Sequence, residues 1–434
     1  MRVLSLTTLY PDPARPRHGI FVENRLRALK ALGHDIRVVA PVPFFPFKGE
    51  LFGDYGRFAA VPATDERYGI HITHPRYVLP PKLGMNVAPL SLAHCFKKSI
   101  DGMLTDGFMP DIVDAHYYYP DGVAAVQAAE SFGIPCVVTA RGTDINLIPR
   151  FPKQRHMILN AAEKAAASIT VAEALRTEMG RLGADKEKIT TLRNGVDLKA
   201  FKPDDHDALK AQYRSTGPLL LSVGHLIKRK GHDLAIKLLP HLPDAHLLIV
   251  GDGPERGALE RLVDAKNIRT RSHFLGEIAH DELHQVYSAG DVLVLASSRE
   301  GWPNVLLEAM ACGTPCVAAP AWGCGEVITE AAAGIVAQER SVPALVEAVQ
   351  NLLAAPPTRE STRAYAEQFS WKPVAKGVEA IWQRAARQPH AQGLGVPTPL
   401  ISRSDSKDDQ QTAPKALLTI DTEECFDWQG DFSQ

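Results

Sequence analysis

Two glutamates eight residues apart, Glu300 and Glu308, are the side chains in this sequence best placed to do chemistry. Between them lies GWPNVLL, a turn of Gly, Trp, Pro and Asn followed by apolar residues that predict a helix. Asn304 is a good N-cap for that helix, with Pro303 just before it. Because the first N–H groups of a helix have no partner inside it, this turn predicts a site for an anion such as a diphosphate.

The two carboxylates themselves are not suited to a phosphate, since like charges repel. Glu308, one turn into the helix, can instead accept two hydrogen bonds from a diol such as ribose, and Glu300 can do the same for sugar hydroxyls. An isolated glutamate on a helix is more often a solvated surface residue. Glu308 differs because apolar neighbours leave little polar helix face around it: they are Leu306, Leu307, Ala309 and Met310.

A basic segment, SVGHLIKRKGHD at 222–233, follows the first strand of the second half of the chain. Gly224 allows another backbone or a ligand to approach closely. Lys228, Arg229 and Lys230 place cations at the same strand end. A lysine and a helix N-terminus could together hold a diphosphate, although a solvated basic loop fits the pattern equally well when it is taken alone.

The first half of the chain also carries polar residues that follow strands, namely the loop at Gly19, then His116, Arg141 and Asp144. A lone histidine is more often packed or solvated than functional, but the position of His116 at a strand end favours a site. The Gly-x-Gly turn in GDGPE is weak, because most such turns only reverse the chain. The sequence contains no GxSxG elbow, HExxH, Walker loop or strand-end Asp-x-Asp, so we expect no metal in the site.

The strands and helices that must position these residues alternate along the chain. Residues 2–8 predict a strand, 20–32 have helical spacing, and 35–41 predict the next strand. A strand, a helix and a strand in this order imply a parallel sheet with helices on its faces. The alternation restarts near residue 219. We therefore predict an α/β fold of two doubly wound, Rossmann-like domains facing across a cleft, with ligands beyond the carboxyl ends of the strands.

Composition shifts set the boundaries of these units. We predict an N-terminal domain at 1–200, a linker at 201–217, a C-terminal domain at 218–370, a closing helix at 371–387 that packs back on the first domain, and a flexible tail at 388–434.

The overall composition excludes several classes of protein. The 434 residues are 45% hydrophobic and 23% charged, as in globular proteins with a large core. A formal net charge of −2 provides no basic field for nucleic acid. The six cysteines form no C-x-x-C pair, which favours reduced thiols in the cytoplasm. The sequence has neither a signal-peptide pattern nor an apolar run of about 20 residues.

Taken together, these features resemble the retaining glycosyltransferases of family 4, which have the GT-B fold. The resemblance covers roughly residues 1–385 in the family's order, and the stretches that carry it are HGIFVENRLRALKALGHDIRVV, DAHYYYPDG, RGTDIN, RNGVD, SVGHLIKRKGHDL, IVGDGPE and EGWPNVLLEAMACGTPCV. The last contains the family's signature of two glutamates separated by seven residues. The resemblance implies metal-independent transfer of a hexose from a nucleotide-diphosphate sugar, with no cofactor, to a glycan or lipid-linked glycan in surface polysaccharide biosynthesis.

The resemblance also assigns roles to residues. Glu308 would hold the ribose, Glu300 the donor sugar and Lys230 the diphosphate, while His116 would approach the anomeric centre; His116, Lys230 and Glu300 form the implied catalytic set. The further donor-binding residues would be Gly19, Gly224, His225, Arg229, Gly301, Asn304 and Val305, and the loop at Gly19 would close over the phosphates. Arg141 and Asp144 would line the acceptor side.

One position departs from the family pattern. Many members have an arginine that pairs with the diphosphate at the position of His225, so His225, Arg229 or Lys230 would supply the charge here. The family is usually assigned a same-face substitution in which the leaving phosphate deprotonates the acceptor, and no carboxylate in this chain is an obvious nucleophile for a double displacement. Two alternatives are a sugar-nucleotide epimerase on a similar fold and a non-catalytic nucleotide-sugar-binding protein.

Two further segments carry weaker signals. Residues 81–104 combine Lys82, Lys97 and Lys98 with apolar residues and could touch the inner face of a membrane, although a solvated basic helix is the favoured interpretation. Near the C-terminus, TIDTEECFDW resembles the first strand of polysaccharide deacetylase domains, as a truncated module or by coincidence. A single strand cannot assemble a metal site, so we expect no deacetylase activity.

Overall fold

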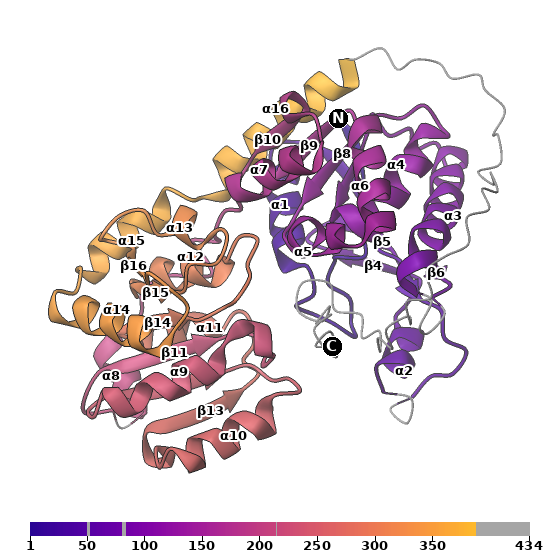
Figure 1. Ribbon diagram of the computed structural model, residues 1–434. Helices are drawn as coiled ribbons and strands as arrows, with labels where there is room; N and C mark the ends of the chain where they lie inside the picture. The colour runs from indigo at the N-terminus through magenta and orange to yellow at the C-terminus, as the bar shows by residue number, and fades with distance from the viewer. Residues whose placement is uncertain (50–52, 80–83, 214, 388–434) are drawn as a thin grey trace, which may run out of the picture.

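The computed structural model describes residues 1–49, 53–79, 84–213 and 215–387, which form two α/β units side by side (Figure 1). The first unit is built on an eight-stranded sheet in the order β10-β9-β8-β7-β1-β2-β5-β4, in which β4 alone is antiparallel to its neighbour. Its strands are β1 (Arg2–Leu6), β2 (Asp35–Val39), β4 (Thr64–Arg67), β5 (Ile70–Thr73), β7 (Ile112–His116), β8 (Cys136–Ala140), β9 (Ala167–Thr170) and β10 (Ile189–Thr191). A separate two-stranded sheet pairs β3 (Val42–Pro43) with β6 (Arg76–Tyr77).

Helices cover the first sheet, and its central strands are buried along their whole length. The helices of this unit are α1 (Ile20–Lys30), α2 (Gly53–Ala60), α3 (Gly84–Thr105), α4 (Val123–Glu130), α5 (Thr143–Asn146), α6 (Pro152–Lys164) and α7 (Glu173–Leu182). Among the described residues, no helix combines the length and the apolar character needed to cross a membrane.

The second unit is a six-stranded, fully parallel sheet in the order β13-β12-β11-β14-β15-β16. Its strands are β11 (Leu219–Val223), β12 (His246–Val250), β13 (Ser272–Gly276), β14 (Val292–Leu295), β15 (Cys316–Ala318) and β16 (Gly334–Val336). Its helices are α8 (His206–Gln212), α9 (His232–Leu238), α10 (Arg256–Ala265), α11 (Leu283–Ala289), α12 (Asn304–Ala311), α13 (Cys324–Val327), α14 (Val342–Ala354) and α15 (Arg359–Glu367).

Each sheet reverses its winding direction at one place. In the first sheet the reversal lies between β1 and β7, and in the second between β11 and β14. In doubly wound sheets, ligands bind in the crevice beyond the carboxyl ends of the strands at such a reversal. The predicted pair of doubly wound α/β units is confirmed, and the two reversals mark where the site should lie. The residue boundaries assigned to the domains stay predictions.

The chain crosses between the two units twice, and the two crossings touch. The first crossing follows β10, and the second leads from α15 into α16 (Trp371–Arg387), which returns to pack on α1. Figure 1 shows α16, in yellow, running from the second unit across the first. The backbone N–H of Val196 donates to the carbonyl of Phe369 at 2.8 Å, and Val196 pairs with Ser370 in a parallel bridge.

Three outcomes concern the predicted elements. The antiparallel pair β4–β5 and the last strand β16 were not predicted, because each of these strands has only three or four residues. The deacetylase-like segment near the C-terminus lies outside the described residues. The position of Asn304 at the start of its helix also differs from the prediction, as described with the site below.

Candidate active site

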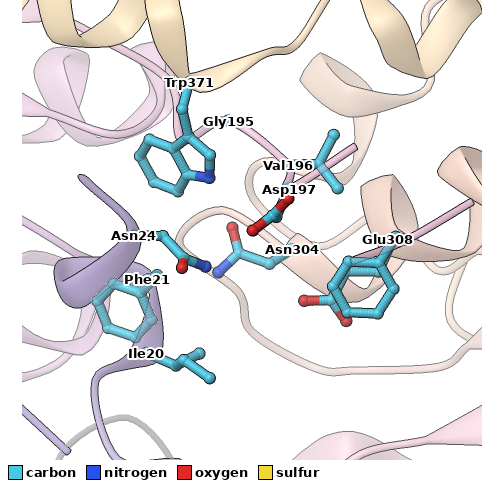
Figure 2. Close-up of a pocket in the computed structure, with 10 residues that line it drawn as sticks. Ile20, Phe21, Asn24, Gly195, Val196, Asp197, Asn304, Glu308 and Trp371 are labelled. Carbon is cyan, nitrogen blue, oxygen red and sulfur yellow. The ribbon is translucent and has the colours of Figure 1, made fainter. Parts of the chain in front are cut away.

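A small pocket, open to solvent, lies between the two units (Figure 2). The start of α1 and the loop at 195–197 form one side, and α12 forms the other. The residues that line it are Ile20, Phe21, Asn24, Gly195, Val196, Asp197, Phe201, Asn304, Glu308 and Trp371. In Figure 2 the side chains of Asn24 and Asn304 point toward one another across it. The pocket therefore contains two of the predicted donor-binding residues.

Glu308 lies one turn into α12, where it is partly buried and lines the pocket. The hydroxyl of Tyr287 donates to its Oε2 at 2.9 Å. Burial raises the pKa of Glu308 above its ordinary value. A carboxylate held by one phenol still has lone pairs available, so Glu308 can accept hydrogen bonds from a ligand diol.

Glu300 follows β14 and lies against the basic turn that follows β11. Its Oε1 is 3.1 Å from Lys230 Nζ, and its Oε2 is 3.7 Å from Arg229 Nη1. Burial alone would raise the pKa of Glu300, but the charges of Lys230 and Arg229 outweigh burial and hold the pKa below its ordinary value. The structure thus brings an ionised carboxylate and two cations together at the reversal between β11 and β14.

Gly224 lies beside the side chain of Lys230. A Cβ at Gly224 would make only an ordinary contact with Lys230, at 3.7 Å, so glycine is favoured here by its backbone φ of +145°, which few other residues adopt. His225 follows it and is partly exposed, and its carbonyl oxygen lies 3.2 Å from His232 Nε2. The structure places His225 on the basic turn but does not test whether it binds a diphosphate.

Gly301 lies where the loop after β14 comes close to the first unit. A Cβ at this position would lie 1.9 Å from the carbonyl oxygen of Arg141. Beside it, Asn146 Nδ2 donates to the carbonyl oxygen of Glu300 at 3.4 Å. Only glycine allows the loop after β14 to rest on the loop after β8, so Gly301 sets the spacing between the two faces of the cleft.

Asn304 is the first residue of α12 and not its N-cap, which corrects the prediction. Pro303 takes the cap position, and its carbonyl oxygen accepts the first helical hydrogen bond, from Leu306 N at 3.1 Å. The Asn304 side chain is instead engaged outside the helix, because its Oδ1 accepts a hydrogen bond from Asn194 Nδ2 at 3.2 Å. Val305 follows as the second residue of the helix, and its predicted role in binding phosphate stays a prediction.

His116 ends β7 and is fully buried between two charged groups. Arg141 Nη2 donates to its Nδ1 at 2.8 Å, and its Nε2 lies 3.1 Å from Asp114 Oδ2. Burial is the main reason that the pKa of His116 is lowered to about 4; the charges of Arg141 and Arg25 act in the same direction, and Asp114 opposes them. His116 is therefore neutral near pH 7. In this conformation both ring nitrogens face protein groups.

The residues assigned to the acceptor side, Arg141 and Asp144, are also buried. The Asp144 carboxylate accepts backbone N–H groups from Tyr118 at 2.8 Å, Gly142 at 2.7 Å and Arg141 at 3.1 Å. Burial raises the pKa of Asp144 despite these bonds. Asp144 thus shapes the loop after β8, and a direct contact between its carboxylate and an acceptor stays a prediction.

Gly19 precedes α1 in a left-handed conformation with a φ of +67°. A Cβ there would lie 2.4 Å from the Leu9 carbonyl, so glycine is required for the loop after β1 to fold against itself. The helix that begins after Gly19 supplies Ile20, Phe21 and Asn24 to the pocket. Its predicted closure over phosphates is not tested by this arrangement.

Four residues at the site were not predicted individually: Arg25, Asp114, Asn194 and Tyr287. Arg25 Nη2 lies 3.3 Å from Asp114 Oδ1, and Trp382 Nε1 of α16 lies 3.4 Å from the same oxygen. The sequence contains a signal for two of them, Arg25 and Asp114. Arg25 lies at helical spacing with buried Val22, Leu26 and Leu29, and Asp114 is two residues before His116, on the same strand face.

Comparisons with known proteins agree with this geometry. The family model described as Glycosyltransferase Family 4 matches residues 19–200, and the model described as Glycosyl transferases group 1 matches residues 205–369. TuaC of Bacillus subtilis (strain 168), a glycosyltransferase named for teichuronic acid biosynthesis, is 28% identical over 384 residues, 86% of this chain and 91% of TuaC. N-acetyl-alpha-D-glucosaminyl L-malate synthase of Bacillus anthracis is 30% identical over 235 residues, 52% of this chain and 61% of the synthase.

Solved structures show the same fold at low sequence identity. Anabaena HepE, crystallised with UDP, is 21% identical with a TM-score of 0.68, over 88% of this chain and 100% of HepE. Sucrose-phosphate synthase of Thermosynechococcus elongatus is also 21% identical, with a TM-score of 0.73, over 88% of this chain and 99% of the synthase. The prediction of two facing Rossmann-like domains is confirmed by these structures.

Proposed function

Because this chain is a family 4 glycosyltransferase with the GT-B fold, we propose that it transfers a hexose from a nucleotide-diphosphate sugar to a glycan or lipid-linked glycan, with retention of anomeric configuration. The observation that carries the proposal is the grouping around α12. Lys230 and Arg229 meet Glu300 before this helix, its first turn faces the cleft, and Glu308 lines the adjoining pocket. Cations, helix N–H groups and two carboxylates match the diphosphate, ribose and sugar of such a donor.

Each residue has a specific task in this proposal. Glu308 accepts hydrogen bonds from the ribose hydroxyls, and the N-terminus of α12 with Lys230 binds the diphosphate. Glu300 now shares Lys230 and Arg229 at 3.1 and 3.7 Å, so a bound diphosphate competes for the same cations. That exchange turns the Glu300 carboxylate toward the hydroxyls of the donor sugar. The uridine nucleotide bound to HepE makes UDP-sugars the first donors to test.

The proposed transfer step is a same-face substitution. The acceptor hydroxyl attacks the anomeric carbon on the face that the diphosphate leaves. The bond between that carbon and the phosphate oxygen breaks, and the acceptor proton passes to the departing phosphate. Lys230 and the helix N–H groups stabilise the negative charge that grows on the leaving group. His116, which is buried and neutral, adds no charge near a carbon that becomes electron-poor.

A lipid-linked acceptor would bring the enzyme to the cytoplasmic face of a membrane. Support for this comes from exposed apolar side chains on the first unit: Phe44, Phe47, Val78 and Leu90. The chain segments that carry Phe44, Val78 and Leu90 are adjacent, since Phe44 N donates to the Tyr77 carbonyl and Val78 N donates to Ser91 Oγ. Exposed aromatic side chains commonly bind at the interface between headgroups and acyl chains.

The proposal is tested by binding of UDP, GDP, ADP and their sugars, measured by thermal shift and calorimetry. We expect one nucleotide class to stabilise the protein, by about 2.7 kcal/mol at a ligand concentration one hundredfold above Kd. Glu308→Gln should weaken the binding of that nucleotide roughly tenfold, because an amide accepts fewer hydrogen bonds from a diol. The matched control is Glu347→Gln, an exposed glutamate on α14, which should bind as the wild type does. Absence of stabilisation by every nucleotide would count against the proposed function.

A further inference from the structure

An unbroken line of polar side chains connects the two faces of the cleft. It starts at Asn304 on α12 and continues through Asn194 and Arg141 to His116. Successive distances are 3.2 Å from Asn194 Nδ2 to Asn304 Oδ1, 2.8 Å from Arg141 Nη1 to Asn194 Oδ1, and 2.8 Å from Arg141 Nη2 to His116 Nδ1. The line then reaches Asp114 at 3.1 Å. It joins two predicted site residues that come from different units.

The donors and acceptors of this line can be arranged in only one direction. A guanidinium has no acceptor, so the oxygen of Asn194 must face Arg141 and its NH2 must face Asn304. Asn304 must then turn its own oxygen toward Asn194, which leaves its NH2 for the pocket. In Figure 2 the nitrogen of Asn304 lies on the side of Asn24, within the pocket. Arg141 fixes the other end as well, because a donor at Nδ1 requires the His116 proton to be on Nε2, facing Asp114.

Burial makes this direction hard to reverse. Asn194 is 4% exposed, Arg141 1% and His116 0%, so water cannot replace a lost partner without opening the interface. Asn304 is the partly exposed end of the line, which is where a ligand would meet it. A ligand oxygen that accepts from the Asn304 NH2 therefore acts on a chain of bonds whose far end is the His116 ring.

We propose that Asn194 and Arg141 are positioning residues that link a nucleotide at Asn304 to the orientation and tautomer of His116. The inference rests on the proposed function, since it needs a nucleoside diphosphate whose oxygen accepts from the Asn304 side chain. It adds Asn194 to the groups that prepare transfer and gives Arg141, which was predicted on the acceptor side, a positioning role. Donor arrival on the second unit is thereby communicated to His116 in the first.

The test measures the His116 ring directly, by 15N NMR on protein labelled at histidine. The chain has 16 histidines, so the His116 signals are assigned by their loss in His116→Gln. In the wild type we expect a neutral ring with the proton on Nε2 and a shift of both ring signals when UDP, or the nucleoside diphosphate selected by the binding panel, is added. Asn194→Ala should still bind the nucleotide but lose the His116 shift.

A matched control separates this line from interdomain contacts in general. Asn146 also bridges the two units, through Glu300, yet it has no place in the line. Asn146→Ala should keep the His116 shift.

In transfer assays Asn194→Ala should lower kcat roughly tenfold, the effect of one lost hydrogen bond of about 1.4 kcal/mol, with a smaller change in donor KM. If Asn194→Ala does not fold, Asn304→Ala breaks the line at its partly exposed end and is measured at saturating nucleotide.

The outcomes distinguish the inference from the function beneath it. If the wild type binds a nucleotide without any His116 shift, or if Asn194→Ala keeps the shift, the inference is wrong while the proposed function stands. If no nucleoside diphosphate binds, the proposed function fails and the inference fails with it. Loss of the shift in Asn194→Ala together with its retention in Asn146→Ala supports the inference.

Discussion

The two strand-end edges that face each other across the cleft hold their charges differently. At the ends of β7 and β8, Asp114, His116 and Arg141 are at most 1% exposed; Arg141 donates to His116, whose Nε2 lies 3.1 Å from Asp114. At the ends of β11 and β14, the Lys230 and Arg229 side chains are each 11% exposed and share one carboxylate, that of Glu300. The first edge is a closed network, and the second offers surplus positive charge toward the cleft. Substitutions should therefore cost stability at the first edge and activity at the second.

The largest effect is expected from Asp114→Ala, at the first edge. It leaves Arg25, which is 2% exposed, without its carboxylate partner at 3.3 Å. Breaking a buried ion pair typically lowers the free energy of unfolding by about 3–5 kcal/mol. Urea denaturation measures this loss, with the surface pair of Lys164 and Glu130, 2.9 Å apart, as a control through Glu130→Ala. A loss below about 1 kcal/mol would mean that this network is not a stability element.

Next in size is Lys230→Ala, at the second edge. It removes a cation that stabilises the leaving diphosphate, so kcat/KM should fall roughly 100- to 1000-fold, or about 3–4 kcal/mol. The free energy of unfolding should change much less, because Arg229 still faces Glu300. The control is Lys228→Ala in the same basic turn, an exposed lysine. Steady-state transfer kinetics and urea denaturation are measured on the same preparations. A loss of stability as large as the loss of activity would contradict the comparison between the two edges.

The dependence of stability on pH should also separate the two edges. His116 has a folded pKa of about 4, lowered mainly by burial, so between pH 4 and 6.5 the unfolded chain binds more protons than the folded one. The free energy of unfolding should therefore fall as pH drops from about 6.5 toward 4, and His116→Gln should remove that part of the slope. Glu300 has a lowered pKa, so its stabilisation persists above its ordinary pKa and is lost only as pH falls through the lowered folded value. Urea denaturation at several pH values checks both signs.

The smallest effect is expected at a contact outside both edges. Glu326 of α13 caps α7 across the interface, because its carboxylate accepts the N–H groups of Glu173 at 2.9 Å and Ala174 at 3.0 Å. Arg193 also pairs with it at 2.9 Å. Glu326→Ala should lower the free energy of unfolding by about 1 kcal/mol, the usual value of a helix cap, and leave nucleotide affinity unchanged. Exposed Glu330 provides the control substitution. A large loss of nucleotide affinity in Glu326→Ala would contradict this expectation and show that the contact controls the cleft.

The second edge could be predicted from the sequence, whereas most of the first could not. The basic turn and the Glu300–Glu308 segment are each continuous, so local spacing and a turn before a helix were enough to predict them. The network at His116 draws on Arg25, Asn194 and Trp382, which are far apart in the chain, and local pattern cannot show that they meet. The position of Asn304 could not be inferred either, since a tertiary partner, Asn194, determined the use of its side chain.

The contact between the two chain crossings has a mechanical consequence. Val196 is hydrogen-bonded to Phe369, and a Cβ at Gly195 would lie 2.7 Å from Trp371 N, so both covalent connections pass through one small region. Two bodies joined at a single pivot can swing relative to each other but cannot slide apart. Gly195, Val196 and Trp371 also line the pocket beside Glu308. Displacement grows with distance from a pivot. Any rotation of one unit relative to the other therefore moves this wall of the pocket least and moves the parts of the units far from the pivot most.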